Sequence, residues 1–482
     1  MRPRTLLILL LVVLGLGAFI WFYERELPSS EERAENAKRV LPLDKDEIRK
    51  VTVEAPSGKV VFERVEHAKD DQDDNAEKAE DGEGDQEEEG EPESEWKITA
   101  PMQARADAFA VDGLLDSLAE LQKNRTLEDV DRKAVGLDKP RATVRIETED
   151  GTRVLQLGAA VPTGGSLIAG LEGSDEAYVV SDTILSQVDR EPGSWRDRQL
   201  FRAGRDAIAR ITVTGPGGKV VLAQQDGQFR IESPFADRAD KTLVDDLYAD
   251  LSGLTAEQFV DQPIGTPAEM GLQPPRGVVE VAFRQGDPLR IELGLPAAAG
   301  EEPPPEPGMP APPAAVHARV GPQLVQTRTR LAQVVERPAG DWRARGLSAF
   351  EVHDIETATV RDGKGEIRLT RAGTDWKRGE ETISYVPVSD FLFALTGAES
   401  VRLLSPQETQ RLARQPVLTI ELATEGSSKE TLTLYPATGQ GAPARVSGRP
   451  LALLLPTEKL QEIRDRLGDV RGAKPLEKKE GE

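Results

Sequence analysis

The residue types that most often carry out catalysis are scarce in this chain and form no catalytic pattern. Its 482 residues contain no cysteine and only three histidines, His67, His317 and His353, which lie far apart. Without cysteine, the chain has no disulfide, thiol nucleophile, iron–sulfur cluster, cysteine-ligated zinc or lipid-anchored cysteine. The spacing of the histidines excludes an HExxH zinc site. The sequence therefore predicts no catalytic, cofactor-binding or metal-binding residue.

Two other catalytic patterns are ruled out, and a third stays open. The segment TGPGGKVV around Gly215 resembles a phosphate-binding loop, but Val220 stands where a Ser or Thr must reach magnesium. The sequence has no G-x-S-x-G nucleophile elbow. Asp and Glu together number 84, so a hydrolase with a pair of catalytic carboxylates is an open alternative.

A repeated Trp-Arg motif provides the candidate binding residues, because guanidinium groups beside an indole ring can hold a ligand. The motif W-R-x-R occurs twice, and its residues are Trp195, Arg196, Arg198, Trp342, Arg343 and Arg345. The alternative is a junction in which the Trp packs against the next domain and the Arg pairs with a carboxylate. Both copies fall at domain boundaries, which favours the junction.

The domains themselves are three copies of one repeat. The pattern I-x-x-V-T-V that begins at Ile48 recurs as I-x-x-I-T-V at Ile208 and as I-x-x-A-T-V at Ile355. Five residues after each pattern a Gly opens a second run of alternating apolar and polar residues, which predicts a β-hairpin. A third strand follows, and it carries an aromatic residue in each copy: Trp96, Phe229 and Trp376.

An amphipathic helix and a second set of strands complete each repeat. Apolar residues spaced by three, four and three positions form one helical stripe in each copy: 111–121, 244–254 and 388–398. Asp107 and Asp240 stand where an N-cap residue is expected. The motif G-L-x-x-P then leads into further strands in the first two copies. We predict an α+β fold of three tandem units, each a mostly antiparallel sheet with one or two amphipathic helices.

Two insertions interrupt the repeats. An acidic insertion at 66–95 holds sixteen acids and two lysines, so it carries 14 of the 23 net negative charges of the chain. Such a segment self-repels and is predicted to be disordered. A Pro-rich insertion at 295–315 is predicted to be extended rather than packed. The repeats outside the acidic insertion are therefore only mildly acidic.

The amino terminus predicts a membrane anchor. Arg2 and Arg4 precede an uncharged run from Thr5 to Tyr23, whose nineteen residues would span about 28 Å as a helix. The positive charges before this run place the amino terminus in the cytoplasm. A cleaved signal peptide is the alternative. The expected localisation is the bacterial inner membrane, single-pass, with most of the chain in the periplasm.

The predicted layout has six parts: a cytoplasmic stub with the transmembrane anchor at 1–26, a tether at 27–43, unit 1 at 44–204, unit 2 at 205–350, unit 3 at 351–470 and a disordered tail at 471–482. Each unit is long enough to bury a core of its own.

The patterns EWKITAP, AD-x-x-x-V, GLDKPRATVRI, LQLG and AYVVS resemble the uncharacterised bacterial envelope family called domain of unknown function 4340. The resemblance is best over about 48–201, recognisable over about 206–350 and weakest in the third unit, which lacks G-L-x-x-P. It implies a partner among ABC-transporter components of the gliding-motility type, beside which such proteins are often encoded. It implies no catalytic residues.

The expected function is that of a non-enzymatic, membrane-anchored accessory or scaffold protein of an ABC-transporter-type envelope complex. The alternatives are a module that binds envelope polysaccharide or peptide, and the carboxylate hydrolase. No cofactor is expected. The net negative charge makes nucleic acid an unfavourable partner, because phosphate binding requires a basic surface.

Overall fold

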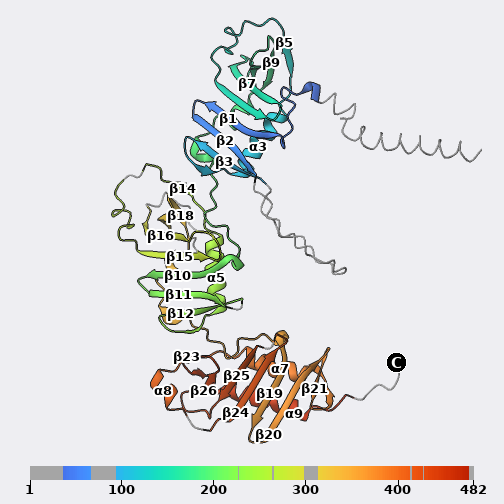
Figure 1. The fold of residues 1–482 in the computed structure, drawn as a ribbon, viewed down its shortest axis with the longest axis vertical. Helices are drawn as coiled ribbons and strands as arrows, with labels where there is room; N and C mark the ends of the chain where they lie inside the picture. Colours follow the sequence, from blue (N-terminus) through green and yellow to red (C-terminus); the bar gives the residue numbers. More distant parts are fainter. Residues whose placement is uncertain are drawn as a thin grey trace, which may run out of the picture. The chain divides into compact units, whose positions relative to one another are not determined.

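A computed structural model describes residues 36–66, 94–225, 227–262, 265–297, 313–412, 415–426 and 428–476, and its ribbon is drawn in Figure 1. The chain divides into two compact units between Arg198 and Gln199. The first unit contains repeat 1. The second contains repeats 2 and 3.

Every repeat forms one nine-stranded antiparallel sheet with the same strand order. In repeat 1 the order is β4-β3-β2-β1-β6-β7-β8-β9-β5. Its elements are β1 (Ile48–Ala55), β2 (Gly58–Glu66), β3 (Ser94–Ala100), β4 (Ala104–Arg105), α3 (Ala108–Ala119), β5 (Arg125–Leu127), β6 (Ala142–Thr148), β7 (Gly151–Ala160), β8 (Ser166–Leu171), β9 (Ala177–Ser181), α4 (Thr183–Val188) and the 3-10 helix η2 (Pro192–Trp195).

Repeats 2 and 3 follow the same plan, with orders β13-β12-β11-β10-β15-β16-β17-β18-β14 and β22-β21-β20-β19-β24-β25-β26-β27-β23. Repeat 2 consists of η3 (Arg205–Ala207), β10 (Ile208–Gly215), β11 (Gly218–Gln225), β12 (Gln228–Ser233), β13 (Asp237–Arg238), α5 (Lys241–Ser252), β14 (Gln258–Phe259), β15 (Gly277–Phe283), β16 (Leu289–Pro296), β17 (Ala315–Val320), β18 (Gln323–Arg328), α6 (Leu331–Val334) and η4 (Ala339–Trp342). Repeat 3 consists of η5 (Val352–Asp354), β19 (Ile355–Asp362), β20 (Gly365–Ala372), β21 (Asp375–Arg378), β22 (Glu381–Ile383), α7 (Tyr385–Thr396), β23 (Arg402–Leu403), α8 (Pro406–Gln410), β24 (Leu418–Thr424), β25 (Lys429–Leu434), β26 (Ala442–Val446), β27 (Leu453–Leu455) and α9 (Thr457–Gly472).

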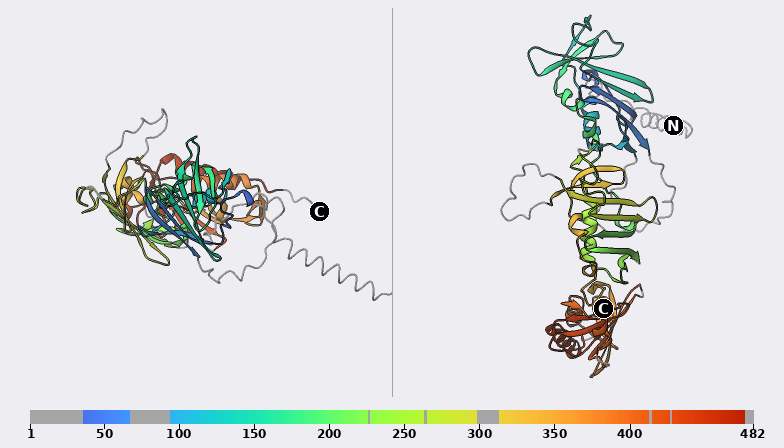
Figure 2. Two further views of the ribbon diagram at one scale, coloured as in Figure 1. Left: turned by 90° about the horizontal axis from the view of Figure 1, so that it is seen from above. Right: turned by 90° about the vertical axis from the view of Figure 1, so that its left-hand side faces the viewer.

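The repeated patterns form the predicted hairpins and helices. β1 pairs with β2, β10 with β11 and β19 with β20, each around a turn that ends at a Gly with positive φ. The predicted helical stripes are buried in the core of each repeat. Two further views of the ribbon are given in Figure 2. The carboxylates of Asp107 and Asp240 accept hydrogen bonds from Ala110 N and Leu243 N, so both act as N-caps.

Each repeat is closed by backbone hydrogen bonds where the chain enters and leaves it. At the start of a repeat, a backbone N–H donates to a carbonyl two residues after the long helix α5 or α7. Leu200 N donates to Leu254 O at 2.9 Å, and Leu347 N donates to Ala398 O at 2.8 Å. On exit, it pairs beside the short edge strand, as in Asp240 N to Trp342 O at 2.8 Å. The last repeat is closed in the same way by its own final segment, in which Leu476 N donates to Thr382 O.

The G-L-x-x-P motif owes its glycine to a close approach of two backbones. Gly271 has a φ of +68°, a conformation that favours glycine. The next strand passes so close that Leu295 N donates to Met270 O at 2.8 Å. A Cβ on Gly294 of that strand would lie 2.2 Å from Met270 O. Repeat 1 has the same arrangement, with Gly136 at a φ of +75° and Gly158 against Val135 O.

We therefore expect Gly294→Ala to destabilise repeat 2 by about 1–3 kcal/mol, because the strand must move away from the loop to admit a methyl group. Gly113→Ala is the contrasting variant, since nothing lies within 4 Å of a Cβ added at this helical position. It should stabilise repeat 1 by about 0.5–1 kcal/mol. Hydrogen exchange followed by mass spectrometry measures both repeats in the full chain. Equal effects of the two substitutions would contradict the close approach.

One part of the predicted fold is corrected. No helix in the described residues is long and apolar enough to cross a membrane. This finding contradicts the transmembrane helix in the predicted fold class, the single-pass anchor and the inner-membrane localisation. The stretch predicted to span the membrane, residues 5–23, lies outside the described residues. So do most of the two insertions, at 67–93 and 298–312, and the end of the tail from 477.

Candidate functional site

The indole rings of the two Trp-Arg motifs are buried in the cores of their own repeats. Trp195 and Trp342 expose 0% and 1% of their surface. Trp195 meets Phe62 edge-on at 5.2 Å between ring centroids. Arg190 and Arg337 cover the two indoles at 4.2 and 5.5 Å from guanidinium carbon to ring centroid. Rings in this position fill the core of the repeat that carries them.

The four motif arginines divide by position. The first arginine of each motif forms a β-bridge to the residue after the edge strand, Arg196 to Ala106 and Arg343 to Ala239. Arg196 is buried, and the guanidinium carbon of Arg343 lies 3.4 Å from the centroid of the Phe235 ring. The second arginines, Arg198 and Arg345, are exposed. The backbone of Arg345 accepts hydrogen bonds from Ser400 N and Ser400 Oγ.

A buried carboxylate in repeat 2 receives an arginine from repeat 3. Asp237 Oδ1 lies 2.9 Å from Arg449 Nε, and the two side chains expose 0% and 2% of their surface. Arg343 Nε lies 3.5 Å from the other oxygen of the same carboxylate. Arg449 also donates to the Ala344 carbonyl at 2.7 Å. Because isolated charges are costly to bury, these groups depend on one another.

Arg238, the residue after Asp237, forms an ion pair of opposite polarity, with the cation in repeat 2 and the carboxylate in repeat 3. Arg238 of repeat 2 donates to Glu430 of repeat 3 at 3.1 Å and to the Gly346 carbonyl. Glu430 also accepts from Ser348 Oγ at 2.7 Å and from Ala349 N. Burial lowers the pKa of the Arg238 guanidinium, and the Glu430 carboxylate opposes that shift. Two adjacent residues of β13, one acidic and one basic, thus form ion pairs with repeat 3. We call Asp237–Arg449 and Arg238–Glu430 the crossed pairs, and they join repeats 2 and 3.

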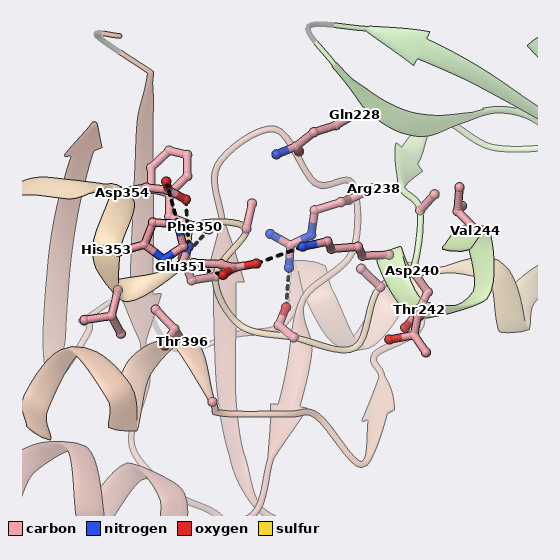
Figure 3. Close-up of a pocket in the computed structure, with 18 of the residues that line it drawn as sticks. Gln228, Arg238, Asp240, Thr242, Val244, Phe350, Glu351, His353, Asp354 and Thr396 are labelled. Atoms are coloured by element: carbon pink, nitrogen blue, oxygen red, sulfur yellow. Dashed lines mark hydrogen bonds and ion pairs between the residues drawn. The ribbon is translucent and has the colours of Figure 1, made fainter. Parts of the chain in front are cut away.

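Beside the crossed pairs lies a cleft of about 630 Å³ between repeats 2 and 3. Its repeat 2 wall comes from β12, β13 and the first turn of α5, and its repeat 3 wall from the 346–354 segment and α7. Figure 3 shows Arg238, Asp240 and Thr242 on one side and Glu351, His353 and Asp354 on the other. The volume falls within the ~300–1,000 Å³ that ligand clefts usually have.

An ion pair between Lys241 and Glu351 crosses this cleft. Lys241 Nζ, in the first turn of α5, lies 2.8 Å from Glu351 Oε1. Its hydrogen bond raises the pKa of Lys241 and lowers that of Glu351, with the attraction between the charges adding to both shifts. His353 lies between two carboxylates, 3.6 Å from Glu351 and 3.4 Å from Asp354. Arg205, which also lines the cleft, pairs with Asp245 of the same repeat.

Apolar side chains from α7 reach solvent at the same place. Tyr385 and Phe393 line the cleft and expose 40% and 58% of their surface. Val386, one residue beyond Tyr385, exposes 61%. Phe350 lines the cleft as well and is half-buried against the repeat 3 core. The cleft therefore combines exposed apolar surface with charged walls, which is the composition of a binding site.

The residues that build this site could not be recognised from the sequence. Glu430 lies 192 positions from Arg238, and Arg449 lies 212 positions from Asp237. The only local signal is that repeat 2 has Asp237-Arg238 where repeat 1 has Ala104-Arg105. As for metals, the described residues contain no group of three or more His, Cys, Asp or Glu side chains that could hold an ion.

Comparison with known proteins gives one match. A family model described as "Domain of unknown function (DUF4340)" matches residues 96–275. No curated protein and no solved structure matches the chain. The matched stretch begins at Trp96 in β3 and ends at Pro275, so it contains the first Trp-Arg motif and both G-L-x-x-P motifs. Residues 96–275 are therefore similar to the uncharacterised DUF4340 family, as the resemblance of the sequence patterns predicts.

Proposed function

We propose that this chain is a non-enzymatic scaffold that holds a partner protein at the cleft between repeats 2 and 3. The observation that carries the proposal is the exposed apolar surface of α7 beside a junction fixed by buried ion pairs. A fixed junction keeps the cleft open without a ligand, so binding loses little free energy to ordering the site.

The ionisation of the cleft supports binding rather than proton transfer. A carboxyl group that acts as a general acid at neutral pH needs a raised pKa. The pKa of Glu351 is instead lowered by Lys241. The partner class that we propose first is the subunits of an ABC-transporter-type complex, as the resemblance implies. The acidic net charge supports a protein partner over nucleic acid.

Site-specific photo-crosslinking in cells tests this proposal. A photoreactive benzoylphenylalanine at position 393 should yield one recurrent adduct, identified by mass spectrometry as a transporter subunit. The control places the same residue at position 109, because Phe109 is 91% exposed but lies on α3 of repeat 1. No adduct from position 393, or the same adducts from both positions, would refute the scaffold. A recurrent adduct with an unrelated protein would retain the scaffold and refute the transporter as its partner.

A further inference from the structure

The basic side chains of the cleft lie on its repeat 2 wall, and most of its acidic side chains lie on its repeat 3 wall. On the repeat 2 wall stand the cations Arg205, Arg238 and Lys241, together with Asp240, whose carboxylate is occupied as the N-cap of α5. Arg238 is occupied by Glu430. On the repeat 3 wall stand Glu351, His353 and Asp354. Lys241 and Glu351 pair across the cleft with 73% and 55% of their side chains exposed.

The apolar part of the cleft lies with the acidic wall. Phe350 precedes Glu351, and Tyr385 and Phe393 come from α7 of the same repeat. An occupant that covers these rings therefore has Glu351 and Asp354 on one side of it and, across the cleft, Lys241 and Arg205, of which Arg205 already pairs with Asp245. Aromatic and aliphatic side chains gain most from such rings, since removal of apolar surface from water favours binding.

We infer that the cleft binds an extended segment of a partner protein in which an aromatic or large aliphatic side chain stands between an acidic and a basic residue. The inference rests on the proposed function and specifies its ligand. The apolar side chain would contact Phe350, Tyr385 and Phe393, the acidic residue would pair with Lys241, and the basic residue with Glu351. Charge complementarity thus selects a peptide of mixed charge.

The free cleft is already suited to this exchange. The Lys241–Glu351 pair is exposed, and such pairs contribute little to stability. A peptide that brings its own acid and base replaces one ion pair by two, and leaves neither charge without a partner. A second copy of this chain is a poorer occupant, because a stable dimer buries roughly 1,200–2,000 Å² over complementary surfaces, whereas here the exposed apolar residues line a concave site.

A peptide array probed with the purified full chain tests the ligand class. The array holds nonapeptides with Phe, Leu or Ala at the centre, flanked by an acid and a base, two acids, two bases or neutral residues. We expect the strongest binding for Phe or Leu with flanks of opposite charge. The variant Phe393→Ala should bind these peptides roughly tenfold more weakly, through loss of apolar contact, whereas Phe109→Ala should bind them like the unchanged chain.

A charge exchange checks the role of the walls. Lys241→Glu should turn the preference away from flanking acids, and the double variant Lys241→Glu/Glu351→Lys should restore mixed-charge binding because it rebuilds the pair in reverse. Binding that ignores the flanking charges, or the same loss in F393A and F109A, would overturn the inference. If position 393 crosslinks a partner in cells while no peptide binds, the scaffold stands and the peptide ligand is refuted. Dimers by light scattering that F393A abolishes would assign the cleft to a second copy instead.

Discussion

Replacing Asp237 by alanine is expected to lower the free energy of unfolding of the 199–482 unit by about 3–5 kcal/mol. The reason is that Arg449, which exposes only 2% of its side chain, and the nearby Arg343 lose the carboxylate that compensates their charges. Hydrogen exchange followed by mass spectrometry gives the measurement, because it reports repeats 2 and 3 separately within the full chain. Protection should fall in both repeats, since the carboxylate joins them.

Asp287→Ala is the matched control, because Asp287 is an exposed residue of the same repeat. This substitution should change the free energy of unfolding by less than about 0.5 kcal/mol. Adding Arg449→Met to Asp237→Ala should recover part of the loss, since the buried cation is then removed as well. Similar protection in D237A and D287A would show that the crossed ion pairs do not fasten the two repeats.

Replacing Trp342 by alanine is the second large effect, with an expected loss of about 3–5 kcal/mol. The ring is 1% exposed and belongs to the core of repeat 2. Trp342→Phe should cost clearly less, because a phenyl ring keeps most of the packing and the indole Nε1 has no hydrogen-bond partner that would be lost. Thermal unfolding of the full chain, with hydrogen exchange to locate the change, measures both variants.

This pair of variants also separates the two interpretations of the Trp-Arg motif. If Trp342 acts only as a core residue, W342A should lose stability, whereas W342F should fold and bind the array peptides as the unchanged chain does. A ligand platform predicts the reverse: W342A keeps its stability and loses binding. The second outcome would reinstate Trp342 as a binding residue.

The repeated elements could be predicted because their signals are local. A hairpin requires alternation around a glycine turn, and a helix requires an apolar stripe, so three copies of each pattern reinforced one another. The edge strands β4 and β13 escaped prediction because two residues are too short for any periodicity. Their place is fixed by pairing with the preceding strand and by the exit segment.

The candidate site could be predicted only in part, for the same physical reason. The Trp-Arg motif was visible because it is contiguous and occurs twice. Glu430 and Arg449 carry no such mark, since they come from separate strands and loops of repeat 3. Whether a carboxylate is solvated or holds a buried arginine depends on what the fold brings beside it. The exposed rings of α7 belong to a helix whose other positions match the predicted apolar stripe, which concealed them.

The backbone hydrogen bonds that join the first and last segments of each repeat to its sheet and helix determine whether repeats can be exchanged by protein engineering. Between the bridge of Arg343 to Ala239 and the bridge of Gly346 to Glu399 only two residues intervene. A repeat excised between these two bridges keeps the backbone hydrogen bonds of its own first and last segments. The backbone would therefore allow one repeat to replace another. The side chains are not interchangeable. If repeat 3 were joined directly to repeat 1, Ala104 would take the place of Asp237 and Arg449 would lose its carboxylate partner. The two-residue strand β13 therefore makes repeat 2, and not repeat 1, the matching neighbour of repeat 3.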